Sequence, residues 1–141
     1  MKLALATLVL IASATFASAS DFPEGSPKFA TSGDAVMKAA KENGKPAILV
    51  FSAAWCGPCQ AMKKDVYPSA EVKPYHDKFN WSYLDIDVDA NNKLSEQYKV
   101  ESIPHIFFVD GAGKVIDQQE GGGSPESFAK KLAKVLKKAA K

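Results

Sequence analysis

The stretch that decides the fold is PAILVFSAAWCGPC, residues 46–59. Its first half is almost wholly apolar, which is typical of a strand buried on both faces of a sheet. Its last part is a Cys-x-x-Cys pair, Cys56 and Cys59, with Pro58 in the first turn of an expected helix, where proline is well tolerated. The stretch therefore predicts a buried strand that leads directly into a helix, with both cysteines at the junction.

Helices and strands alternate along the rest of the chain. Apolar spacing, glycine stops and proline breaks predict helices over 34–43, 57–66, 70–78, 91–98 and from 125 onward. Apolar or alternating runs predict strands over 46–52, 81–88, 106–109 and 114–118, with a short edge strand near Phe29. Strands joined through helices run parallel, and the turn at 110–113 adds an antiparallel hairpin. We expect an α/β fold, with a mixed central β-sheet of four to five strands and helices on both faces.

Composition divides the chain into three segments. Residues 1–19 have a basic start, a short apolar centre and an Ala-Ser-Ala end, which is the layout of a secretory signal peptide. Residues 20–32 mix proline and glycine with polar residues and predict an irregular arm, and residues 33–141 form the folded domain. The apolar centre is too short to serve as a stable membrane anchor, which needs about 20 residues.

Overall composition narrows the classes of partner. The 141 residues are 46% hydrophobic and 24% charged with a formal net charge of +2, which fits one globular domain and does not favour a nucleic-acid binder. In an exported protein a disulfide can persist. The two cysteines close a loop too short to constrain the unfolded chain much, so a purely structural staple explains them poorly.

The position of the two cysteines favours redox chemistry. At the start of a helix, free backbone N–H groups and the helix dipole stabilise a thiolate, which makes Cys56 the nucleophile. Cys59 lies one turn further in and is expected to be shielded, so it acts second as the resolving cysteine. Gly57 leaves the surface around Cys56 open, Pro58 fixes a helical backbone angle, and Trp55 adds a flat apolar surface beside the nucleophile.

A zinc half-site is the main structural alternative for the pair. It would need two further ligands, and the chain holds only His76 and His105, which lack any zinc-finger spacing. We therefore expect no metal and no cofactor other than the Cys56–Cys59 disulfide itself.

The ordered motifs along the chain resemble the thioredoxin family. They are residues 45–59 with their Trp-Cys-Gly-Pro-Cys, then Leu-Asp-Ile-Asp at 84–87, Val-Glu-Ser-Ile-Pro at 100–104, and the final glycine-rich loop and helix. The resemblance covers about residues 33–140. It implies the thioredoxin fold and dithiol–disulfide exchange.

The resemblance also implies roles for further residues near the cysteines. Pro104 matches the family's cis-proline, which faces the cysteine pair, and Ile103 before it would present backbone groups to an extended substrate. Gly121 matches the glycine that lets a substrate backbone approach closely. Trp55 matches the tryptophan packed beside the nucleophile.

Three positions depart from the family pattern. The buried acid six residues before the first cysteine is replaced by Val50, and the lysine on the next strand by Tyr83. The usual proton acceptor for Cys59 is therefore missing. The threonine after the cis-proline is replaced by His105. An imidazolium there could tune the Cys56 thiolate, but because alternate strand residues face opposite sides, we favour a histidine that points away from the site.

Two charged groups are interpreted as solvated surfaces. Asp85, Asp87 and Asp89 could suggest calcium, but they lack the glycine and distal glutamate of an EF-hand loop. The lysines of the last helix suit a helix C-terminus. His76 lies in a polar stretch and is expected at the surface.

The resemblance favours a protein-disulfide reductase acting on exported proteins. The Gly-Pro pair is that of thioredoxins, whose potential of about −270 mV lies well below the −120 mV or so of the exported oxidant. We expect a monomer located in the periplasm, with secretion as the alternative, and a membrane-embedded thiol reductant as electron donor. The rivals are a disulfide oxidase or isomerase and, from another class, a metal carrier using Cys56, Cys59 and His105 or a non-catalytic docking module.

Overall fold

The computed structural model describes residues 21–141, and the predicted signal peptide lies outside the described residues. The elements, in chain order, are α1 (Gly33–Asn43), β1 (Ala47–Ser52), α2 (Gly57–Ala61), a π-helix η2 (Met62–Val66), a 3₁₀-helix η3 (Lys73–Lys78), β2 (Asn80–Asp85), α3 (Asp89–Gln97), β3 (His105–Val109), β4 (Val115–Glu120) and α4 (Pro125–Ala139). Within residues 21–141 no helix is long and apolar enough to cross a membrane.

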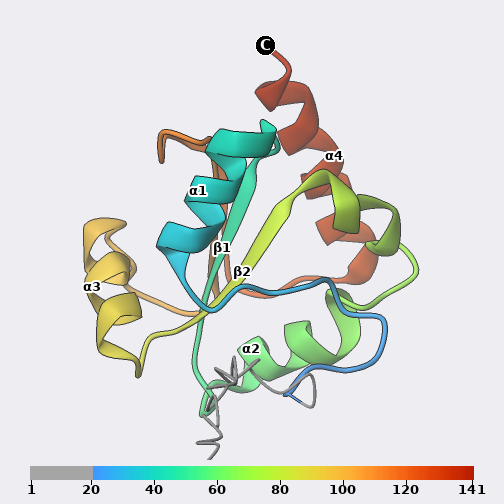
Figure 1. The fold of residues 1–141 in the computed structure, drawn as a ribbon. Helices are drawn as coiled ribbons and strands as arrows, with labels where there is room; N and C mark the ends of the chain where they lie inside the picture. Colours follow the sequence, from blue (N-terminus) through green and yellow to red (C-terminus); the bar gives the residue numbers. More distant parts are fainter. Residues whose placement is uncertain (1–20) are drawn as a thin grey trace, which may run out of the picture.

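The four strands form one mixed sheet in the order β2-β1-β3-β4. β1 runs parallel to β2 and antiparallel to β3, and β3 and β4 form an antiparallel hairpin. Figure 1 shows α1 and α3 on one side of the sheet and α4 on the other, with α2 at the end opposite the C-terminus. The expected mixed sheet with helices on both faces is therefore confirmed.

β1 is the centre of the structure. All six of its residues are buried, as the apolar run predicted. Ile48 and Val50 face the side covered by α4, whereas Leu49 and Phe51 face the side covered by α1. The strand thus belongs to both hydrophobic clusters and ends at Ser52, four residues before Cys56.

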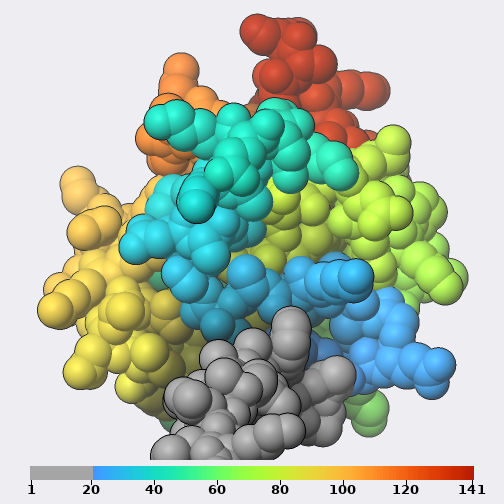
Figure 2. All heavy atoms as spheres, in the orientation of Figure 1, coloured from blue at the N-terminus to red at the C-terminus, as the bar shows by residue number. Residues whose placement is uncertain are grey.

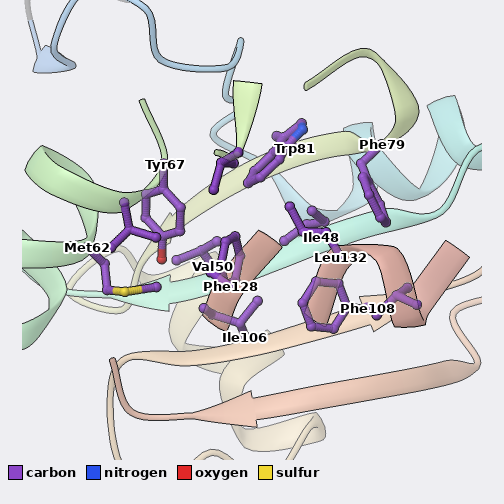
Figure 3. Close-up of a cluster of buried hydrophobic side chains, with 13 residues drawn as sticks. Ile48, Val50, Met62, Tyr67, Phe79, Trp81, Ile106, Phe108, Phe128 and Leu132 are labelled. Carbon is purple, nitrogen blue, oxygen red and sulfur yellow. The ribbon is translucent and has the colours of Figure 1, made fainter. Parts of the chain in front are cut away.

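The larger cluster fills the space between the sheet and α4 (Figure 3). Phe128, Leu132 and Val135 are fully buried along one face of α4, and the helix predicted from residue 125 onward is confirmed. The ring of Phe128 lies edge-on to Tyr67, with centroids 5.6 Å apart, and 6.3 Å from Trp81. Aromatic packing therefore holds α4 on the sheet.

The arm before α1 is irregular but firmly packed. Phe22 stacks on Phe29, with centroids 4.7 Å apart, and Phe29 makes an edge-on contact with Tyr83 at 5.6 Å. In Figure 2 this arm, drawn in blue, crosses the surface below α1. The edge strand expected near Phe29 is reduced to one bridge, in which Ala30 pairs with Ser82 of β2.

Several element boundaries differ from the sequence prediction, and the helix predicted over 70–78 is the shorter 3₁₀-helix η3. The strand predicted to reach Val88 ends at Asp85, because the Asp85 carboxylate accepts the N–H of Asp87 at 2.9 Å and turns the chain. The helix predicted over 57–66 becomes a π-helix after Ala61, in which the Tyr67 N–H donates to the Met62 carbonyl five residues back, at 3.1 Å.

Replacing Phe128 with alanine should lower the free energy of unfolding by about 3–5 kcal/mol, because it leaves a cavity among buried aromatic rings. Urea denaturation followed by circular dichroism measures the change. Lys130→Ala, on the exposed face of the same helix, is the control and should stay within about 0.5 kcal/mol of the unchanged chain. Equal effects of the two substitutions would contradict this description of the core.

Candidate active site

The cysteine pair occupies the junction between β1 and α2. Cys56 and Cys59 form a disulfide, with their Cα atoms 5.2 Å apart. Cys56 is the N-cap residue of α2, in an extended backbone conformation, and its sulfur accepts the N–H of Cys59 at 3.2 Å. This N–H has no partner within the helix, so it is free to stabilise charge on the Cys56 sulfur.

The two sulfurs are not equally accessible. Cys56 is 6% exposed and Cys59 only 1%, so an incoming disulfide meets Cys56 first. Gly57 follows on the exposed side of α2, and a Cβ added to it would meet no atom within 4 Å. The surface beside Cys56 is therefore open, and Pro58 occupies the second position of the helix.

Two loops from the later part of the chain lie beside the pair. The Ile103–Pro104 peptide bond is cis, as the family resemblance implies, and the Ile103 carbonyl oxygen lies 3.7 Å from the Cys56 sulfur. Gly121 donates its N–H to the Pro104 carbonyl at 2.8 Å and has a φ of 77°, a conformation that favours glycine. The proline loop and the glycine loop are thus joined to each other at the site.

Trp55 has a partner that the sequence alone did not reveal. Its side chain is 69% exposed, and its indole N–H donates to the Asp87 carboxylate at 3.1 Å. Asp87 follows β2, the neighbour of β1, which brings the two residues to the same end of the sheet. Asp87 thus fixes the orientation of an exposed indole beside Cys56.

The positions of the missing acid and lysine face each other in the sheet. Val50 and Tyr83 are register partners in β1 and β2. The Tyr83 hydroxyl is hydrogen-bonded to the hydroxyl of the fully buried Ser52, at 2.6 Å. Burial raises the pKa of Tyr83 above its ordinary value of about 10, and the bond to Ser52 only partly opposes this. At neutral pH the phenol keeps its proton, so this hydroxyl pair is not a base that replaces the acid.

Neither histidine is turned toward the cysteines. His105 is buried in β3, with Nε2 2.8 Å from the Gln118 side-chain oxygen and its ring stacked on Phe107 at 4.2 Å. His76 Nε2 lies 2.8 Å from the Tyr67 carbonyl oxygen, so this ring is engaged by the backbone rather than free at the surface. The role of His105 in tuning the thiolate stays a prediction, and its contacts favour the interpretation that it points away from the site.

Two of the three aspartates near β2 have separate contacts. Asp85 accepts a backbone N–H, and Asp87 holds Trp55. Among residues 21–141 no three histidine, cysteine, aspartate or glutamate side chains are grouped so that they could hold a metal ion.

Comparison with known proteins agrees with this geometry. The family model of the thioredoxin-like domain matches residues 33–136. A thioredoxin H-type protein of Oryza sativa is 40% identical over 81 residues, 56% of this chain and 62% of that protein. A thiol:disulfide interchange protein TxlA homolog of Synechocystis is 38% identical over 89 residues, 60% of this chain and 46% of that protein. The chain therefore spans about half the length of these relatives.

A solved structure of a thioredoxin has a similar fold. The solution structure of a thioredoxin from Thermus thermophilus superimposes with a TM-score of 0.72, covering 81% of this chain and 90% of that chain at 21% identity.

Replacing Tyr83 with phenylalanine should lower the free energy of unfolding by about 1–3 kcal/mol, because the Ser52 hydroxyl is then buried without its partner. Adding Ser52→Ala to the same chain should recover most of this loss, since both polar groups are then removed. Urea denaturation of the two variants measures the difference. A double variant less stable than Tyr83→Phe alone would contradict a paired role for the two hydroxyls.

Proposed function

The chain belongs to the thioredoxin-like family, and from this premise we propose that it is a protein-disulfide oxidoreductase that acts through Cys56 and Cys59. One observation carries the proposal: the two cysteines form a disulfide at the start of a helix, with Cys56 the more exposed and the cis-proline loop beside it. A disulfide that only stabilised the fold would need neither the exposed indole nor the open surface at Gly57.

The reaction transfers two electrons to a client disulfide. The Cys56 thiolate attacks one client sulfur, so that a Cys56–client bond forms and the second client sulfur leaves as a thiolate. The Cys59 thiolate then attacks the Cys56 sulfur, which forms the Cys56–Cys59 disulfide and releases the first client sulfur. The client is reduced to a dithiol and the chain is oxidised. Cys59 lies one helical turn from Cys56. Their Cα atoms are 5.2 Å apart, which is within the range that a disulfide needs.

Substrate positioning falls to the groups around Cys56. The backbone of Ile103 would hydrogen-bond to an extended client segment, as the family resemblance implies. Gly121 lets the client backbone approach, and its bond to Pro104 holds the two loops in one position. Trp55, fixed by Asp87, offers an apolar surface to the client.

We favour reduction of exported proteins as the physiological direction. The Gly57-Pro58 pair is that of thioredoxins, and the composition of residues 1–19 predicts export. A reductase outside the cytoplasm needs electrons from across the membrane, so its donor would be a membrane-embedded thiol reductant. The same site run in reverse would make the chain a disulfide oxidase, and the reduction potential separates the two directions.

The Cys56–Cys59 couple should have a reduction potential near −270 mV, the value of thioredoxin. Equilibration of the full chain in glutathione buffers of graded ratio, followed by alkylation and mass spectrometry, measures it. A value near −120 mV would contradict the reductase direction while leaving the exchange chemistry intact.

A Cys59→Ser variant should accumulate mixed disulfides with reducible client proteins, because Cys56 still attacks but nothing resolves the intermediate. Non-reducing electrophoresis after incubation with insulin detects these adducts, which must vanish on adding dithiothreitol. Cys56→Ser is the matched control and should form at least tenfold fewer. Equal yields from the two variants would rule out Cys56 as the nucleophile.

A further inference from the structure

A cavity of about 220 Å³ lies beside the cysteine pair, and the exchange reaction does not use it. Pro58, which stands between the two cysteines, forms part of its rim. Its floor includes Met62 and Val66, two buried members of the main hydrophobic cluster, and Met62 lies at one end of that cluster in Figure 3. Asp65 is the one charged residue of the lining. The cavity is smaller than the roughly 300–1,000 Å³ of sites for drug-sized ligands, so its size suits a single side chain.

Two glycines keep this cavity open from the side of the β4–α4 loop. A Cβ added to Gly122 would lie 3.8 Å from Met62 Cγ and 3.9 Å from its sulfur, so a larger side chain here would lie against the cavity floor. A Cβ on Gly123 would come within 2.8 Å of the Ser127 hydroxyl in the first turn of α4. The β4–α4 loop therefore lies close to Met62 in η2 and to Ser127 in α4, and its two glycines contribute no side chain to fill the cavity.

The same glycines leave backbone groups available at the rim. Both residues are exposed, and within residues 21–141 neither N–H donates a hydrogen bond. Peptides that bind in an extended form use free backbone groups for affinity and pockets for alternate side chains for specificity. The Gly122–Gly123 segment offers both features side by side.

The cavity is also placed correctly for a client held at Cys56. Pro58 lies two residues from Cys56 and lines the cavity. An extended chain advances about 3.3 Å per residue, and its alternate side chains share a face. The residue two positions from the client cysteine therefore lies about 7 Å away on the same face. A side chain at that position would stay close to Pro58, which lies two residues from Cys56 and lines the cavity.

We infer that this cavity is a specificity subsite that binds one apolar side chain of an extended client polypeptide, two positions from the client cysteine that reacts with Cys56. The inference rests on the exchange reaction proposed above and adds a client preference to it. Asp65 at the rim disfavours an acidic residue at the same place, because like charges repel there.

The test uses the reduced full-length chain and short peptides. Each peptide has one cysteine, which is joined to thionitrobenzoate by a disulfide bond. When Cys56 attacks the peptide sulfur, the disulfide to thionitrobenzoate breaks and the coloured thionitrobenzoate thiolate leaves. The absorbance of this thiolate over time gives the rate of attack on each peptide. Four peptides carry leucine or serine two positions before or after the cysteine. At one of these two positions, before or after the cysteine, the leucine peptide should react about tenfold faster than the matching serine peptide. This is the discrimination expected of a small apolar pocket.

Filling the cavity should remove this preference. Gly122→Leu fills it from the loop, Ala61→Leu fills it from α2, and each should bring the leucine-to-serine rate ratio close to one. Gly122→Ala is the matched control: it changes the glycine but leaves most of the cavity, and it should keep the ratio of the natural chain. The ratio compares two peptides on one protein, so a general change in activity cancels.

Several outcomes would overturn the inference. They are a ratio below twofold in the natural chain, a ratio that survives in either filled variant, or a ratio lost in Gly122→Ala. Cysteine alone, bound to thionitrobenzoate, separates this failure from that of the proposed function. A natural chain that attacks this small disulfide but shows no peptide preference lacks the subsite only. A chain that attacks neither lacks the exchange reaction itself, and the inference fails with it.

Discussion

The structure depends on the burial of β1 on both faces and its hydrogen bonding on both edges. β1 pairs with β2 on one side and β3 on the other, and its six residues are inaccessible to solvent. Because the strand is held on both faces and both edges, the position and direction of the chain at its last residues are fixed. Cys56, four residues after the strand ends at Ser52, is consequently presented at a constant place at the end of the sheet. The proposed exchange requires this constancy, because a nucleophile must meet a client sulfur in line with the bond it breaks.

The second requirement is that distant loops meet at the same end of the sheet. β3 follows the proline loop and β4 precedes the glycine loop, and their antiparallel pairing brings the two loops together. The hydrogen bond from Gly121 to Pro104 then joins them directly. The site is thus assembled from three segments that are far apart in sequence, and each is positioned by a strand of the sheet. A change in the register of β3 against β4 would disturb the proposed client binding without touching either cysteine.

Most of the fold could be predicted because it follows from local patterns. The run before Cys56 is apolar without interruption, and the face of α4 repeats at helical spacing, so both elements are set by short-range sequence. The end of β2 was predicted wrongly because Val88 continues the apolar pattern, whereas the carboxylate of Asp85 captures a backbone N–H and turns the chain. The bonds from Trp55 to Asp87 and from Tyr83 to Ser52 join residues about thirty positions apart. No pattern within one element could have revealed them, although the parallel pairing of β1 and β2 would have brought these residues close together.

Val50 stands where the family has a buried acid, and this replacement removes the usual acceptor for the Cys59 proton without removing either cysteine. A carboxylate beneath a resolving cysteine must be desolvated and paired, and both requirements cost stability. Val50 instead packs in the main hydrophobic cluster, and the polar groups near it are the mutually bonded hydroxyls of Tyr83 and Ser52. This hydroxyl pair is satisfied without a charge, whereas the buried hydroxyl of Tyr67 in the same cluster has no hydrogen-bond partner among the described residues. In the proposed exchange, the proton of Cys59 leaves by another route, and the open surface at Gly57 beside Cys56 offers one to solvent.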